Sequence, residues 1–306
     1  MSGWKRIVLA AIGVLLIGGG SAYYWLIVES HMPSDAHFEI DMNEVRELAD
    51  QIRGDKPVEI QVEQVAKFTF PATAVVAGDG WSSTDLPVFS YQLVYPDGRT
   101  GIVDTALSKE QGGDNLTGFD QAAYDRMEAA IGRASFILLT HEHMDHIGGL
   151  AAYPDLAKII PSVDMTKEQI DHPERSAPVV IAKDILGAFK PVTYDKYLAI
   201  APGVVLIKSP GHSPGSQMVY VRKQDGTEIL FLGDVAWRFR NIETQRERAR
   251  LITQFYLKED RLAVFGELKA LHERHAAEPD LAMMPGHDGI VEAALVEKGV
   301  FVAGFK

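Results

Sequence analysis

The stretch FILLTHEHMDHIGG, residues 136–149, decides the fold. Its first five residues form an apolar run that is typical of a buried strand. Four potential metal ligands follow at once: His141, His143, Asp145 and His146. In an extended segment the two histidines at 141 and 143 point to the same side, and the pair at 145 and 146 falls where the chain turns into two glycines and can face a second ion. Imidazole and carboxylate groups suit zinc, iron or manganese, so this stretch predicts a metal site at a strand end.

Three further candidate ligands follow apolar, strand-like runs and lie among small residues. PGHSPG (210–215) places His212 after the run 204–207, FLGD (231–234) ends on Asp234, and MMPGHD (283–288) supplies His287. Taken alone, each of these residues is more often a capping aspartate or a loop histidine, but together with the first cluster their order is specific. Asp234 has two carboxylate oxygens and can bridge two cations. Because the chain has no cysteine, only His, Asp and Glu remain as ligands for such a site.

The ordered series His141-x-His143-x-Asp145-His146, His212, Asp234, His287 resembles the metallo-β-lactamase-fold hydrolase superfamily over residues 57–306. The resemblance implies an α/β fold, a four-layer αββα sandwich with two divalent metal ions at one edge of its sheets. It assigns His141, His143 and His212 to the first metal. It assigns Asp145, His146 and His287 to the second, with Asp234 bridging both. The implied nucleophile is a metal-bridging hydroxide held with the carboxylates of Asp145 and Asp234, and zinc is the expected metal, with iron or manganese as alternatives.

Within that superfamily the segments SPGHSPGSQ (209–217) and PGHD (285–288) resemble the N-acyl homoserine lactone hydrolase branch. That branch usually has a tyrosine three residues after the bridging aspartate, whereas this chain has Trp237. An indole donates one hydrogen bond but cannot transfer a proton, so Trp237 is expected either to line an apolar substrate pocket or to pack in the core. The resemblance favours a small-molecule lactone or carboxylic ester as substrate. Thioesterase, phosphodiesterase and β-lactam hydrolase activities are alternatives, as is a metal-binding module without catalysis.

The composition narrows the class of partner. The 306 residues carry a formal net charge of −12, and 46% of them are apolar, which is enough for one large core. A negative field of this size repels polyanions, so no nucleic acid is expected as a partner. The sequence gives no signal for an oligomeric state.

The N-terminus predicts an extracytoplasmic location. Trp4-Lys5-Arg6 precedes the uncharged apolar run 7–28, which is long enough to cross a hydrocarbon core and carries Tyr23, Tyr24 and Trp25 near its end. The positive-inside rule then predicts an inner-membrane anchor with the catalytic domain in the periplasm. The alternative is a cleaved signal peptide, with 7–17 as its apolar region and 20–22 as its cleavage site, and secretion to the periplasm.

The expected organisation is an anchor or signal segment over 1–30, a linker with a short helix over 31–56, and the hydrolase domain over 57–306. Strands are predicted over 59–68, 88–95, 101–104, 136–139, 204–207, 217–221 and 229–232. Helices are predicted over 42–52, 119–131, 180–189, 243–257 and 260–275. Five arginines between 238 and 250 are expected to lie on a solvated helix face or to attract an anionic substrate.

Overall fold

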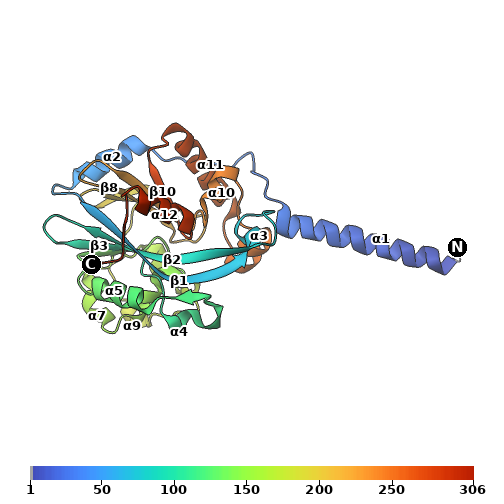
Figure 1. Ribbon diagram of the computed structural model, residues 1–306, viewed down its shortest axis with the longest axis horizontal. Coiled ribbons are helices and arrows are strands. Elements are labelled where there is room, and N and C mark those ends of the chain that lie inside the picture. The colour runs from blue at the N-terminus through green and yellow to red at the C-terminus, as the bar shows by residue number, and fades with distance from the viewer. Residues whose placement is uncertain (1–2) are drawn as a thin grey trace.

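Two β-sheets pack face to face in the structure, a computed structural model that describes residues 3–306 (Figure 1). The first sheet has the strand order β11-β1-β2-β3-β5, with β4 pairing to β1. Its strands are β1 (Glu59–Pro71), β2 (Ser83–Val94), β3 (Thr100–Val103), β4 (Gly118–Phe119), β5 (Phe136–Leu138) and β11 (Val302–Ala303). The second has the order β10-β9-β8-β7-β6. Its strands are β6 (Tyr197–Ala201), β7 (Val204–Lys208), β8 (Gln217–Arg222), β9 (Glu228–Gly233) and β10 (Ala282–Pro285).

The side chains of each sheet contribute to two apolar layers, one between the sheets and one beneath the outer helices. In β7, Val204 and Leu206 face the first sheet and pack with Phe89 and Leu138, while Val205 and Ile207 point outward. Successive residues of a strand face opposite sides, and both sides are apolar here because both are covered. The inner layer is the core shared by the sheets.

Helices cover both outer faces. On the first sheet lie α5 (Gln121–Ile131) and α6 (Met144–Ala152). On the second lie α2 (Met42–Gln51), which agrees with the short helix expected over 42–52, and α11 (Arg261–Ala277). The sequence expectation of two sheets between helical layers is confirmed. The remaining helices are α3 (Ala72–Val75), α4 (Lys109–Gly112), α7 (Leu156–Ile159), α8 (Lys167–Asp171), α9 (Lys183–Leu186), α10 (Phe239–Thr244) and α12 (Gly289–Glu297), with short turns at η2 (Gly113–Asn115), η3 (Ile160–Ser162) and η4 (Pro173–Ser176).

The prediction of one continuous helix over 243–257 is wrong. α10 ends at Thr244, Gln245 adopts a left-handed conformation, and a separate wide helical segment, η5, covers Leu251–Leu257. The side-chain amide of Asn241 donates to the carbonyls of Val75 and Arg246, which fixes the chain as it leaves the helix. The helix predicted over 180–189 is only the single turn α9. Strand β10 agrees with the strand-like run expected before His287, whereas the strands β4, β6 and β11 and helix α12 were not anticipated.

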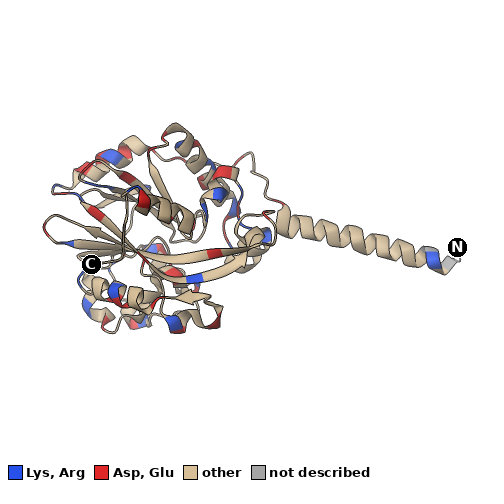
Figure 2. Ribbon diagram, in the orientation of Figure 1, with Lys and Arg blue, Asp and Glu red and all other residues tan. Residues whose placement is uncertain are grey.

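The apolar N-terminal run forms a helix that projects from the body (Figure 1). It comprises α1 (Gly3–Tyr23) and a last wide turn, η1 (Tyr24–Val28). Ile7–Val28 is long and apolar enough to cross a membrane, and none of it is buried in the body. Figure 2 shows no charged residue along this helix beyond its first turns. Residues 1 and 2 of the expected 1–30 segment lie outside the described residues.

Candidate metal centre

All seven candidate ligands lie in segments that leave the strands at one end of the two sheets. β5 leads through a short loop into α6, and this connection carries His141, His143, Asp145 and His146. His212 lies in the loop between β7 and β8, Asp234 directly follows β9, and His287 follows β10 by two residues. The structure therefore brings together the seven residues singled out in the sequence, in two groups of converging donor atoms.

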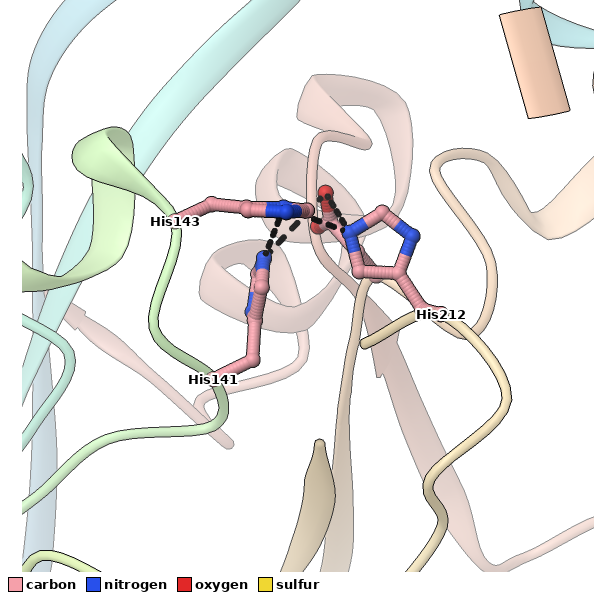
Figure 3. Close-up of side chains that lie close together, drawn as sticks. His141, His143 and His212 are labelled. Atoms are coloured by element: carbon pink, nitrogen blue, oxygen red, sulfur yellow. Dashed lines mark hydrogen bonds and ion pairs between the residues drawn. The ribbon is translucent and has the colours of Figure 1, made fainter. Parts of the chain in front are cut away.

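The first group consists of three imidazoles and one carboxylate oxygen (Figure 3). The Nδ1 atom of His143 lies 3.1 Å from His141 Nε2 and 2.8 Å from His212 Nε2. The Oδ2 atom of Asp234 lies 3.4 Å from His212 Nε2 and 3.7 Å from His141 Nε2. Four ligand atoms bonded to one zinc ion at about 2.0–2.1 Å lie roughly 3.3 Å apart, so this spacing fits a tetrahedral metal site.

The second group lies on the other side of the Asp234 carboxylate. Its Oδ1 atom is 3.3 Å from His146 Nε2 and 3.2 Å from His287 Nε2, and the latter is 3.5 Å from Asp145 Oδ2. One oxygen of Asp234 thus faces each group. This is the geometry required of a carboxylate that bridges two cations.

The imidazoles of the first group are in the state that a metal needs. Burial lowers the pKa of His143 and of His212 to about 3, so both imidazoles are neutral and keep a free lone pair. Nε2 of His146 and Oδ1 of Asp234 are buried without a hydrogen-bond partner in the described chain. Unpaired buried polar atoms are costly. A cation between the ligands would satisfy both atoms, so the residues present fit a metal pair.

The second ring nitrogen of four histidines meets a protein oxygen. His146 Nδ1 is 2.8 Å from Asp104 Oδ2, His212 Nδ1 is 2.5 Å from Glu259 Oε1, and His287 Nδ1 donates to the carbonyl of Pro87 at 2.9 Å. His141 Nδ1 is 3.2 Å from the hydroxyl of Thr140. Such partners fix the tautomer and orientation of a metal-binding imidazole and leave the other nitrogen for the ion.

Arg248 is buried beneath this site, contrary to the expectation of a solvated helix face. Its guanidinium pairs with the carboxylate of Glu259 and donates to the backbone carbonyl of Asp234 at 3.0 Å. Burial raises the pKa of Glu259, while the arginine opposes that shift. Arg248 therefore supports ligands of both groups, His212 through Glu259 and Asp234 directly.

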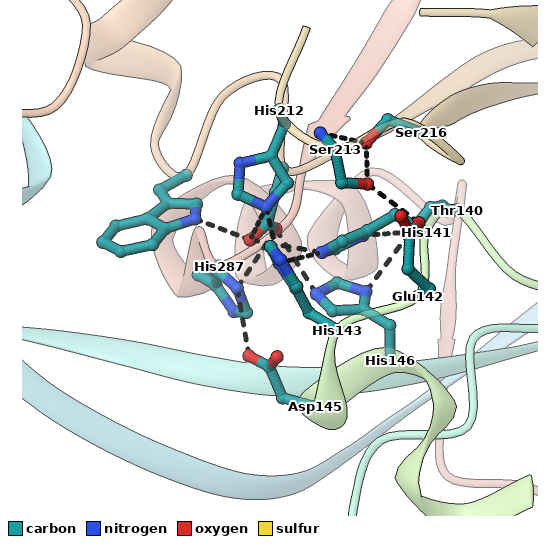
Figure 4. Close-up of polar contacts among 12 residues, drawn as sticks. Thr140, His141, Glu142, His143, Asp145, His146, His212, Ser213, Ser216 and His287 are labelled. Carbon is teal, nitrogen blue, oxygen red and sulfur yellow. Dashed lines mark hydrogen bonds and ion pairs between the residues drawn. The ribbon is translucent and has the colours of Figure 1, made fainter. Parts of the chain in front are cut away.

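Glu142, inside the first motif, ties two ligand loops together (Figure 4). Its carboxylate accepts hydrogen bonds from the hydroxyl of Ser213 at 2.8 Å and from the amide of Gly215 at 3.2 Å. His212 is thereby held next to His141 and His143. The contact explains why the glutamate between these histidines is buried rather than solvated.

Trp237 is buried against the carboxylate that divides the two groups. Its indole nitrogen donates to Asp234 Oδ2 at 2.6 Å. Its ring packs with Val75, Val76 and Leu86, and the Arg248 guanidinium lies 5.0 Å from the ring centre. Of the two roles expected for this residue, the structure favours packing, combined with a hydrogen bond that the sequence did not suggest.

Sequence reasoning missed the supporting residues Asp104, Glu142, Arg248 and Glu259. Asp104 could have been found, because it is the last residue of the strand predicted over 101–104, and Asp234 likewise lies at the end of an apolar strand. Glu259 and Arg248 lie 47 and 36 residues from His212 and carry no local signal.

Comparison with known proteins agrees with this geometry. The profile of the metallo-beta-lactamase superfamily matches residues 83–294, well over half of the chain and including every candidate ligand. The chain belongs to the metallo-beta-lactamase superfamily. It is a hydrolase of this fold, and the expectation that it is an enzyme of this class is confirmed.

The proteins similar to this superfamily member include N-acyl homoserine lactonases. An N-acyl homoserine lactonase from a Bacillus species is 26% identical over 178 residues, covering 53% of this chain and 68% of the relative. The solved structure of a quorum-quenching N-acyl homoserine lactone lactonase superimposes with a TM-score of 0.62 at 19% identity, covering 79% and 97% of the two chains. A dizinc quorum-quenching lactonase, AidC, solved with the product N-hexanoyl-L-homoserine, gives a TM-score of 0.52 at 15% identity, covering 78% of this chain and 90% of its own.

Proposed function

We propose that this hydrolase opens N-acyl homoserine lactones, or cleaves closely related carboxylic esters, with two zinc ions held by His141, His143, Asp145, His146, His212, Asp234 and His287. The observation that carries the proposal is Asp234, whose two oxygens face two separate groups of ligands. The Bacillus relatives are N-acyl homoserine lactonases, and the structural neighbour AidC is a dizinc lactonase. The first fact supports a lactone as the substrate, and the second supports zinc as the metal.

The protein's own residues supply placement and orientation. Two bound divalent cations would lower the pKa of a shared water toward neutrality and polarise the substrate carbonyl. Asp234 sets the separation of the two metal positions. His143 and Asp145 are the only ligands that are more than marginally exposed, so a substrate approaches from their side. Trp237 cannot supply a proton to the leaving oxygen; it donates to Asp234 and holds its orientation.

A substrate panel tests the reaction. The purified chain, loaded with zinc in detergent, is offered N-hexanoyl homoserine lactone, an aryl ester, a glutathione thioester, a phosphodiester and a β-lactam. We expect the lactone to show the highest kcat/KM, and the variant Asp234→Ala to lose turnover of it. Asp280→Ala, a change at an exposed aspartate, is the matched control and should retain activity. Faster cleavage of the thioester or phosphodiester than of lactone and ester would overturn the assignment.

We also propose that Ile7–Val28 anchors the enzyme in the inner membrane with the catalytic body in the periplasm. The length of the run, its lack of charge and the Lys5-Arg6 pair before it support this orientation. Alkaline washing of native membranes should leave the enzyme in the pellet. Its release with a mature N-terminus near Tyr23 would instead favour the cleaved signal peptide.

A further inference from the structure

The body carries exposed aromatic side chains around the foot of the N-terminal helix. They come from three separate segments: η1, the loop after α3, and η5. Tyr256 is 74% exposed, Trp81 63% and Phe255 55%. Soluble proteins rarely leave several large apolar side chains exposed together. We call this group the foot surface: Tyr24, Trp25, Trp81, Leu251, Phe255 and Tyr256.

Contacts join the foot surface to the candidate span. The rings of Trp25 and Phe255 meet edge to face with their centres 6.3 Å apart. Trp81 stacks on Tyr23 at the same separation and donates its indole hydrogen to the Tyr23 hydroxyl at 3.2 Å. The foot surface is therefore continuous with the last turns of the apolar helix, and Figure 1 shows α3 beside this end of α1.

Side chains of the body hold the end of the helix by hydrogen bonds to its backbone carbonyls. The guanidinium of Arg246 donates to the carbonyl of Val28 at 2.6 Å, and the hydroxyl of Thr73 donates to the carbonyl of Ile27 at 3.2 Å. Arg250 donates to the carbonyl of Trp25 and lies over its ring. These contacts fix the end of the helix relative to the body, so the depth of the helix in a bilayer also sets the position of the foot surface.

The charge of η5 and its flanks fits a lipid surface. No acidic residue occurs between Glu247 and Glu259, although the chain as a whole carries a net charge of −12. Lys258 is exposed at the end of this segment. Tryptophan and tyrosine favour the level of the lipid headgroups, and a nearby lysine suits anionic headgroups.

We propose that the foot surface is a membrane-docking surface that lies in the headgroup layer of the bilayer holding α1. This inference rests on the proposed anchor. It adds that the catalytic body lies on the bilayer instead of standing free on a flexible stalk.

Docking at η5 also places the metal centre near lipid. Arg248 and Glu259, the buried pair that supports His212 and Asp234, lie three residues before and two residues after this segment. The ligand loops are therefore linked to the residues that touch the bilayer. An acylated substrate that partitions into lipid suits such a placement.

Spin labels test the docking in the full chain. The protein has no cysteine, so single-cysteine variants can be labelled cleanly. Labels are placed by Tyr256→Cys and Phe255→Cys on the foot surface, by Leu15→Cys in α1, and by Val180→Cys, an exposed control on the segment before α9. Each variant is reconstituted into phosphatidylcholine and phosphatidylglycerol vesicles, and relaxation by oxygen is compared with relaxation by a water-soluble nickel complex.

Docking predicts that oxygen relaxes the labels at 255 and 256 several-fold more than nickel does, whereas nickel dominates at 180. If the label at 15 is in lipid but those at 255 and 256 behave as the one at 180, docking is wrong and the anchor stands. A label at 15 in water overturns both. Spin–spin broadening at 256, with protection from both reagents, would indicate a second copy of the chain on this surface and overturn lipid docking.

Discussion

Gly286 provides the sharpest perturbation of the Asp234 carboxylate, the proposed bridge between the metals, without removing a ligand. A Cβ atom at this position would lie 2.2 Å from Asp234 Oδ1 and 3.0 Å from the carbonyl oxygen of Gly233. The carboxylate cannot easily turn away, because its other oxygen accepts the indole hydrogen of Trp237. The backbone is also fixed, since the amides of Gly286 and His287 donate to the carbonyls of Ala236 and Trp237.

The overlap in Gly286→Ala requires a displacement of about 1 Å between Asp234 and the chain beside His287. Metal–ligand distances tolerate only about ±0.2 Å, and a misplacement of about 1 Å in a catalytic site costs roughly 100-fold in rate. We therefore expect the metal content to fall from about two ions per chain to about one, because Oδ1 faces the second group. kcat/KM for N-hexanoyl homoserine lactone should fall about 100-fold.

The matched control is Gly289→Ala, three residues further along the same connection. Its Cβ would meet only Pro87, at an ordinary contact distance of 3.4 Å. It lies at the start of α12, where alanine is favoured over glycine. Metal content is measured by elemental analysis and lactone opening by proton release in weak buffer. A Gly286→Ala protein with two metals and activity equal to the control would refute the reasoning.

Three other variants probe the surroundings of the site. Burial raises the pKa of Glu267 to about 8. The stabilisation by the protonated carboxyl is therefore complete below the ordinary glutamate pKa and is lost progressively as the pH rises from there to about 8. The free energy of unfolding should fall, relative to Glu267→Gln, by on the order of 4 kcal/mol between pH 4.5 and 9, and parallel pH profiles in chemical denaturation would contradict this. Trp237→Phe should lower metal affinity about tenfold through loss of the hydrogen bond to Asp234; unchanged affinity in chelator competition would show that the bond does not support the metals. Deleting residues 1–22 should leave the melting temperature unchanged, whereas deleting 1–30 removes the hydrogen bonds that Arg246 and Arg250 donate to the backbone of 25–28, at about 0.5–1.5 kcal/mol each; equal melting temperatures would contradict this difference.

Much of the site was predictable because its ligands follow strands. A residue at a strand end has its direction set by the sheet, so a motif such as HEHMDH after an apolar run places several ligands together. The outer faces were predictable for a similar reason: the apolar spacing in 260–275 agrees with α11.

The rest depends on contacts between residues distant in sequence. Arg248 belongs to a run of charged residues that reads as a solvated helix, yet it is buried because Glu259 and the Asp234 carbonyl satisfy its guanidinium. The helix expected over 243–257 breaks at Gln245 for the same tertiary reason, since the Asn241 amide donates to the carbonyl of the distant Val75 as well as to that of Arg246. Periodicity does not report such partners. The contacts of residues 25–28 with the body could not be predicted either, because an apolar run does not show which arginines its backbone carbonyls will meet.

The central claim is that the two groups of ligands hold two metal ions that the reaction needs. The most direct measurement is elemental analysis of the purified chain, together with lactone turnover before and after treatment with a chelator. The account predicts about two transition-metal ions per chain, activity lost with the metal and restored by zinc, and little of either in Asp234→Ala. Protein that holds no metal and retains its activity in the chelator would contradict it.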